Sequence, residues 1–109
     1  GIQIAHEWDE GCGPVWINPP YGRGLIRPFV AVWAQAHSER GARVALLLPA
    51  NKTDQGWFHE YVWDSSASRP VEGVGIDFIP YRVKFGGLTS GAPFPSMIVR
   101  YGLTRPEGL

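Results

Sequence analysis

The sequence has almost no cysteine, no excess of charge of either sign and no long hydrophobic run. Its single cysteine, Cys12, excludes an internal disulfide and a metal site built from cysteines. Ten Lys and Arg balance ten Asp and Glu, which argues against a general polyanion binder but does not exclude a local basic edge. No apolar run approaches the roughly 18 residues of a membrane span, and no signal peptide is recognisable. We therefore expect a cytoplasmic protein that does not contact a membrane.

What the sequence does contain indicates one globular domain. Its 109 residues suit a single domain, and 44% of them are hydrophobic against 18% charged. The 14 glycines and 10 prolines lie between compact apolar runs, so we interpret them as loop residues rather than low complexity. We divide the chain into an N-terminal arm (1–13), an α/β domain (14–101) and a C-terminal tail (102–109).

The first part of this domain predicts a strand followed by a helix. Val15–Ile17 is a short apolar run between prolines, which is typical of a buried strand. Apolar residues then recur at helical spacing, at Ile26, Phe29, Val30, Trp33 and Ala34. Pro28 fits only within the first turn, which places the helix start near Ile26 or Arg27, and Gly41 ends the helix.

The remaining sequence predicts several strands and one more helix. Arg43–Pro49 is continuously apolar, as in strands of parallel sheets that have helices on each side. A helix capped by Thr53 or Asp54 then runs through residues 57–62. A loop follows at 65–75, then strands at 76–79 and 81–85, a glycine-rich loop at 86–95, and a last strand at 96–101.

This order of elements predicts an α/β fold. Strands that alternate with helices favour a right-handed unit with a mostly parallel sheet and flanking helices. The final strands are joined by a loop and not by a helix, so we expect the last strand to pair antiparallel.

The motif that carries chemistry is Asn18-Pro19-Pro20-Tyr21, directly after the first strand. Ligands of such sheets bind at the carboxyl ends of the strands. The Asn18 side-chain oxygen and the Pro19 carbonyl can both accept hydrogen bonds from an amino group such as adenine N6, which frees the nitrogen lone pair. The prolines stiffen the turn, and Tyr21 offers a face on which an extruded base can stack. The alternative is a plain loop, because Asn-Pro and Pro-Pro are common in turns.

The motif and its surroundings resemble the phage-type DNA N-6-adenine methyltransferase family, which depends on S-adenosylmethionine. The resemblance covers roughly residues 13 to 101 and rests on the runs VWINPPYGRG, VALLLPANKTDQGWFHEYV, VKFGG and APFPSMIVRY. It implies a Rossmann-like methyltransferase fold, S-adenosylmethionine as cofactor, and double-stranded DNA as partner. It also implies catalytic roles for Asn18, Pro19, Pro20 and Tyr21.

The same resemblance implies an upstream cofactor-binding segment, which residues 1–13 do not supply. We therefore expect the chain to be the catalytic half of such an enzyme, as a fragment, a truncated product or one piece of a complex. The cofactor-binding residues stay unassigned. The Val15–Ile17 strand would then lie at a sheet edge, where an apolar strand invites self-association or pairing with a partner chain.

Three basic residues near the motif are candidates for contacts to DNA phosphates. Arg23 and Arg27 lie at a predicted helix N-terminus, where an anion can bind, and Lys52 follows the second strand at the same edge as Asn18. The alternative is that all three are ordinary solvated residues. The histidines are not at metal-ligand spacing, so we predict no metal and expect structural roles for His37 and His59.

Three functions are open at this point. The first is methylation of adenine N6 in DNA by direct transfer, which needs no covalent intermediate. The second is a non-catalytic half-domain that binds nucleic acid or a partner chain. The third is a methyltransferase that acts on a protein glutamine or an RNA base through the same tetrapeptide.

Overall fold

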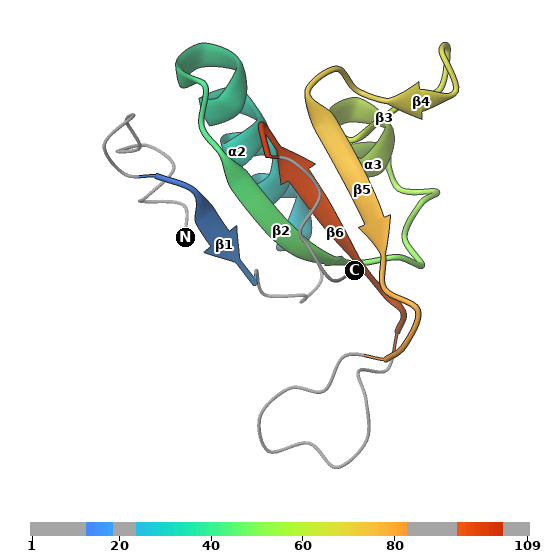
Figure 1. The fold of residues 1–109 in the computed structure, drawn as a ribbon. Helices are drawn as coiled ribbons and strands as arrows, with labels where there is room; N and C mark the ends of the chain where they lie inside the picture. The colour runs from blue at the N-terminus through green and yellow to red at the C-terminus, as the bar shows by residue number, and fades with distance from the viewer. Residues whose placement is uncertain (1–12, 19–23, 83–93, 104–109) are drawn as a thin grey trace.

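A computed structural model describes residues 13–18, 24–82 and 94–103. Within these residues the main sheet contains four strands, which are β1 (Val15–Ile17), β2 (Val44–Pro49), β5 (Val74–Phe78) and β6 (Ser96–Tyr101). The described part of the chain adds two helices, α2 (Ile26–Arg40) and α3 (Gly56–Tyr61). Two short strands, β3 (Trp63–Asp64) and β4 (Arg69–Pro70), form a separate hairpin (Figure 1).

The sheet has the order β1-β2-β6-β5 and is mixed. β1 pairs parallel with β2, whereas β6 pairs antiparallel with both β2 and β5. The predicted α/β class and the antiparallel last strand are confirmed. The prediction of a mostly parallel sheet is wrong, because β6 enters between β2 and β5 and contributes two antiparallel pairings.

Side-chain polarity explains which strands take the centre of the sheet. All six residues of β2 and five of the six residues of β6 are buried. β5 is less apolar, because it contains Gly75 and Asp77 and ends on the exposed Phe78. β1 has only three residues, and no other described strand lies against its outer edge. The two apolar strands are therefore central, and β1 lies at one end of the sheet formed by the described strands.

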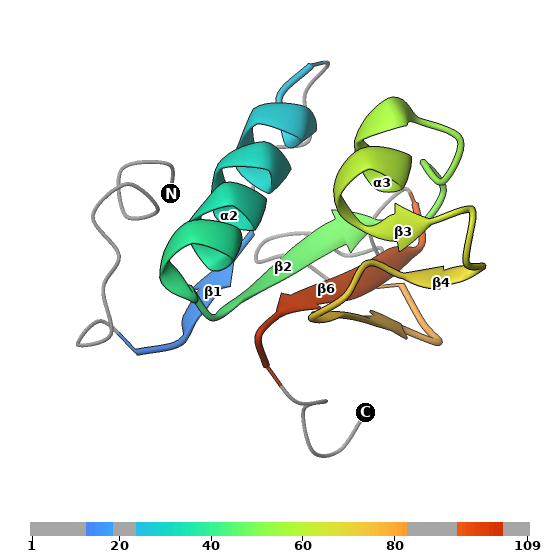
Figure 2. The same cartoon turned by 90° about the horizontal axis from the view of Figure 1, so that it is seen from above.

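Both described helices cover the same face of the sheet (Figure 2). Val30 and Trp33 of α2 belong to one buried cluster with Trp57 and Phe58 of α3. The sheet residues of that cluster are Ile17, Val44, Leu46, Leu48, Met97, Val99 and Tyr101. The prediction of helices on each side of the sheet is wrong for the described residues, because no helix of this part of the chain covers the second face.

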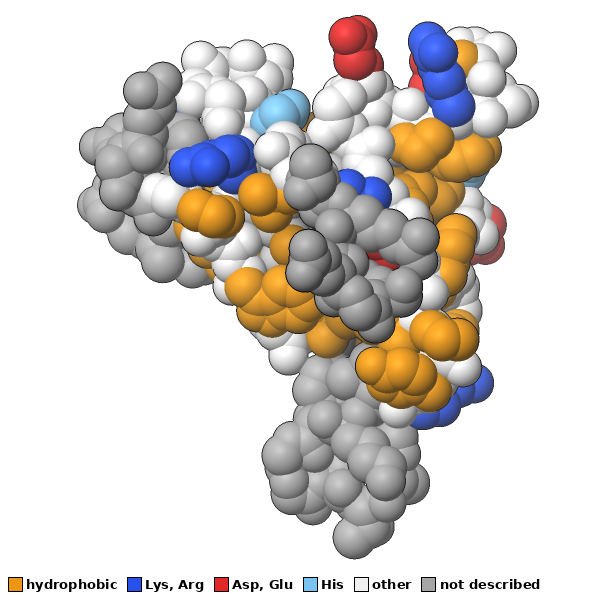
Figure 3. Space-filling view, viewed as in Figure 1, with side chains coloured by type: hydrophobic (Ala, Val, Ile, Leu, Met, Phe, Trp, Pro, Cys, Tyr) orange, Lys and Arg blue, Asp and Glu red, His pale blue; other side chains and the backbone are white. Residues whose placement is uncertain are grey.

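That second face combines a small apolar cluster with an ion pair. Ala45, Leu47 and Ile98 are buried there, and Ile79 and Leu103 pack against them. Beside this cluster the Arg100 Nε donates to Asp77 Oδ2 over 2.6 Å, and Arg100 Nη1 donates to the Leu103 carbonyl over 2.8 Å. A Cβ atom at Gly75 would displace the Arg100 guanidinium from this position. Figure 3 views the molecule from this side.

The two helices differ in how well their starts were predicted. α2 begins at Ile26 and ends before Gly41, whose φ of 72° is readily adopted by glycine. For α3 the predicted caps Thr53 and Asp54 are wrong. Its N-cap is Gln55, which makes no capping bond and instead accepts a hydrogen bond of 2.9 Å from Trp57 Nε1.

The segment after α3 is more ordered than the sequence predicted. The expected loop at 65–75 is wrong, because it contains β4 and the first two residues of β5. Asp64 stabilises the hairpin turn by accepting bonds from the Ser66 and Ala67 amides at 3.0 and 3.3 Å. Of the strand predicted at 81–85, Tyr81 and Arg82 lie outside any strand and the rest lies outside the described residues.

Candidate active site

The carboxyl ends of β1 and β2 share one edge of the sheet because the two strands run parallel. Asn18 is exposed directly after β1, and Lys52 is half-buried in the turn after β2. These two predicted site residues therefore follow neighbouring strands at the same edge. The other predicted residues of this region, Pro19, Pro20, Tyr21 and Arg23, lie outside the described residues. The catalytic and DNA-binding roles of all of them stay predictions.

Hydrogen bonds from several elements hold the turn that carries Lys52. The Ala50 amide donates to the Pro95 carbonyl at 2.7 Å, and the Gln55 amide donates to the Lys52 carbonyl at 3.1 Å. His59 Nε2 lies 2.6 Å from the Thr53 carbonyl, and its Nδ1 lies 2.8 Å from Ser65 Oγ. A carbonyl oxygen can only accept, so we assign the proton to Nε2. His59 thus anchors this turn, consistent with a structural role.

Arg27 lies in the first turn of α2 and is paired with α3. Its Nη2 donates to Glu60 Oε2 over 2.6 Å, and its guanidinium carbon lies 5.9 Å from the centre of the Tyr61 ring. This hydrogen bond lowers the pKa of Glu60 and raises the pKa of Arg27. The start of α2 has no side-chain cap and no acidic residue in its first turn. Glu60 therefore brings negative charge to a helix end that favours it.

Sequence reasoning missed this pair because its members are 33 residues apart. No local spacing links Arg27 with Glu60, and only the packing of α2 against α3 brings them together. The Arg27 side chain is still 58% exposed, so solvent or a ligand reaches its guanidinium. A DNA phosphate at Arg27 would have to share or replace the Glu60 carboxylate.

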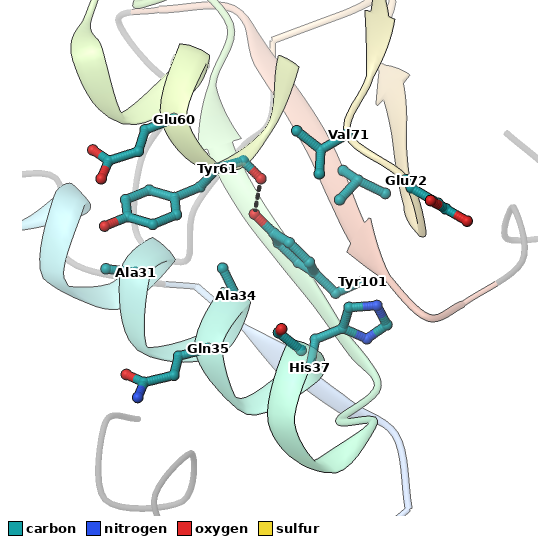
Figure 4. Close-up of a pocket in the computed structure, with 11 residues that line it drawn as sticks. Ala31, Ala34, Gln35, His37, Glu60, Tyr61, Val71, Glu72 and Tyr101 are labelled. Carbon is teal, nitrogen blue, oxygen red and sulfur yellow. Dashed lines mark hydrogen bonds between the residues drawn. The ribbon is translucent and has the colours of Figure 1, made fainter. Parts of the chain in front are cut away.

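A pocket of about 590 Å³ lies between the two helices and the start of β5 (Figure 4). Tyr101 forms part of its wall, and its hydroxyl donates to the Tyr61 carbonyl at 2.7 Å. Burial raises the pKa of Tyr101. Tyr101 pairs with Val44 and Val74, the first residues of β2 and β5. The pocket therefore lies toward the amino ends of these strands, opposite to Asn18.

This position bears on where a cofactor could bind. A methyl donor for the predicted reaction at Asn18 would have to reach the carboxyl edge of the sheet, whereas Val74 and Tyr101 place one wall of this pocket toward the amino ends of β2 and β5. No contact among the described residues assigns a side chain to a cofactor. Within the same residues no group of three His, Cys, Asp or Glu side chains could hold a metal ion. None of the described helices has the length and apolar character to cross a membrane.

Comparison with known proteins identifies one family. The profile of DNA N-6-adenine-methyltransferase (Dam) matches residues 3–106. The match includes Asn18-Pro19-Pro20-Tyr21, both central strands and most of the arm at 1–13. Searches of curated proteins and of solved structures found no match.

Proposed function

Because the chain belongs to the DNA N-6-adenine-methyltransferase family, we propose that it transfers a methyl group from S-adenosylmethionine to the N6 amino group of adenine in DNA. The observation that carries this proposal is the family match over nearly the whole chain, together with Asn18 at the carboxyl edge of β1. S-adenosylmethionine would supply an electrophilic methyl group. The residues that bind S-adenosylmethionine stay unassigned. We propose that the chain has a Rossmann-like methyltransferase fold of the phage type.

In this proposal the chain prepares the amine for attack. The Asn18 side-chain oxygen and the Pro19 carbonyl accept the two N6 hydrogens, which directs the nitrogen lone pair away from the adenine ring. Pro20 limits the motion of the turn, and Tyr21 stacks on the extruded base. Because the target adenine must leave the duplex to reach these groups, base flipping precedes transfer.

Basic residues at the same edge would contact the DNA backbone. We assign this role to Arg23, Arg27 and Lys52, because Asn18 and Lys52 follow neighbouring strands and α2 begins after the motif. Backbone contacts position a duplex without reading its sequence. The proposed partner is double-stranded DNA, and the proposed compartment is the cytoplasm.

A second function is favoured by the edge position of β1. A half-domain whose apolar edge strand pairs with another chain would bind nucleic acid or a partner without catalysis. Titration calorimetry with S-adenosylmethionine distinguishes the two functions. Heat of binding by the purified chain supports independent catalysis, whereas no heat at millimolar ligand favours the half-domain.

The substitution Asn18→Ala tests the catalytic proposal. Loss of one of two acceptors for the amine should lower methyl transfer by at least about a hundredfold, while the exposed side chain leaves the fold intact. Asn51→Ala is the matched control, because Asn51 is an exposed asparagine in the turn after β2. Transfer is measured as protection of unmethylated DNA against a nuclease that is blocked by adenine methylation.

Two results of this assay would contradict the proposal. Full activity of Asn18→Ala would remove the tetrapeptide from the mechanism. Methyl transfer to RNA or to a glutamine peptide, with no transfer to DNA, would show that the third function considered from the sequence is the correct one.

A further inference from the structure

Two large aromatic side chains project into solvent at the end of β5 and directly after it. Phe78, the last residue of the strand, is 65% exposed, and Tyr81 is 64% exposed. Arg82 follows and is also exposed. Exposure of two aromatic rings within four residues is unusual, because burying each of them would contribute about 2 kcal/mol. Figure 3 shows hydrophobic side chains gathered at this end of β5, with a basic side chain next to them.

The segment lies at the same edge of the sheet as Asn18. β5 is antiparallel to β6, and β6 is antiparallel to β2, so β5 points in the same direction as β1 and β2. Phe78 and Tyr81 therefore extend from the carboxyl edge. β1 and β5 are separated by two central strands, which is about 14 Å across the sheet at roughly 4.8 Å per strand.

The charge of this segment also suits a polyanion. The acidic residue directly before Phe78 is Asp77. Its side chain is only 6% exposed and is paired with Arg100 at 2.6 Å. Asp77 therefore adds no uncompensated negative charge beside the rings. Arg82 provides positive charge next to two flat apolar surfaces, a combination that binds nucleic acid through stacking and phosphate contacts.

We infer that Phe78, Tyr81 and Arg82 form a second DNA-contact surface, on which bases outside the catalytic site stack and a phosphate pairs with Arg82. This inference rests on the proposed function, because it takes DNA as the ligand. The distance of about 14 Å along the edge corresponds to roughly four nucleotides at 3.4 Å each. The surface would thus hold the target strand about four nucleotides from the adenine.

Binding to two fluorescein-labelled DNAs tests the surface. One is a fully paired duplex, and the other shares its labelled strand but has mismatches in the second strand that leave a central bubble unpaired. Tyr81→Leu should weaken binding to the bubble DNA by at least about fivefold, because aliphatic side chains do not stack on bases as rings do. Tyr81→Phe keeps the ring and should bind like the unchanged chain. Fluorescence anisotropy gives the dissociation constants, and circular dichroism checks that each variant is folded.

Salt dependence tests Arg82 independently. Arg82→Gln should reduce the slope of log K against log salt by about one unit, the effect of one lost phosphate contact. Arg69→Gln is the matched control, because Arg69 is exposed in β4, near the opposite end of β5, and should leave the slope unchanged.

The outcomes separate this inference from the proposed function. If the unchanged chain methylates DNA and Tyr81→Leu and Arg82→Gln both bind like it, the surface is wrong and the function stands. A change in the mass of Tyr81→Leu by light scattering, without a change in DNA affinity, would assign the rings to contact with a second copy. If the unchanged chain binds neither DNA, both proposals fail.

Discussion

At the scale of single residues, the pairing of Arg27 with Glu60 connects structure to the proposed chemistry. A cation in the first turn of a helix opposes the helix dipole, and the Glu60 carboxylate offsets that effect at 2.6 Å. The pair also fixes the start of α2, which follows the segment that carries Pro19, Pro20 and Tyr21. Arg27 therefore has a structural partner in the free chain, and DNA would compete for it.

We predict that Glu60→Gln lowers stability at neutral pH and not in acid. Because Arg27 lowers the pKa of Glu60, the contribution of the carboxylate is complete above the ordinary value of 4.5 and disappears as the pH falls through the lowered pKa. Thermal unfolding should give a higher Tm for the unchanged chain at pH 7, and the two Tm values should converge in strong acid.

Glu39→Gln is the control for this prediction. Glu39 lies 3.7 Å from its sequence neighbour Arg40 and does not connect two elements, so its loss should change the Tm less. A Tm difference for Glu60→Gln that stays constant down to strong acid would show that the charge of Glu60 does not stabilise the fold.

At the scale of elements, local signals determined what could be predicted. Pro28 and Gly41 mark the ends of α2, and the apolar run SMIVRY corresponds to β6 residue for residue. The hairpin of β3 and β4 was missed because strands of two residues are too short to show alternation. The position of Asn18 at the end of a strand was also predictable from a local signal, because the short apolar run of β1 directly precedes the motif.

The ion pair between β5 and β6 gives a prediction at this scale. Asp77→Ala should reduce the free energy of unfolding by about 3 kcal/mol, because it leaves the Arg100 side chain, only 14% exposed, without its carboxylate partner. Urea unfolding measures the change. The double variant Asp77→Leu with Arg100→Met should lose less, because no charge is then left uncompensated. Unchanged stability of Asp77→Ala would show that the pair contributes little.

At the scale of the whole molecule, strand order was beyond prediction from the sequence. The pairings of β6 with β2 and β5 join residues far apart along the chain, and no local pattern records which strand lies beside which. The pairing of Arg27 with Glu60 depends on the same long-range packing. The sequence could therefore locate the motif and its edge, but not the side chains that the fold brings to that edge.

The edge position of β1 predicts self-association of the whole molecule. Trp16 is 57% exposed on this strand, no strand of the described residues pairs with its outer edge, and apolar edge strands pair readily with one another. Sedimentation velocity should show a mass that rises with concentration, and Trp16→Lys should shift the distribution to the monomer. Leu25→Lys changes another exposed apolar residue and should leave the mass distribution as it is in the unchanged chain. A monomer at every concentration would contradict the prediction.

The central place of β6 has a consequence for synthesis of the chain on the ribosome. β2 leaves the exit tunnel long before residues 96–101, yet its second neighbour in the sheet is β6. Among the described strands, β5 is paired with β6 and with no other strand of the main sheet. Until residues 96–101 have been synthesised, the VALLLP run of β2 lacks the strand that pairs with one of its edges. A nascent chain in that state is open to chaperones and to misassembly.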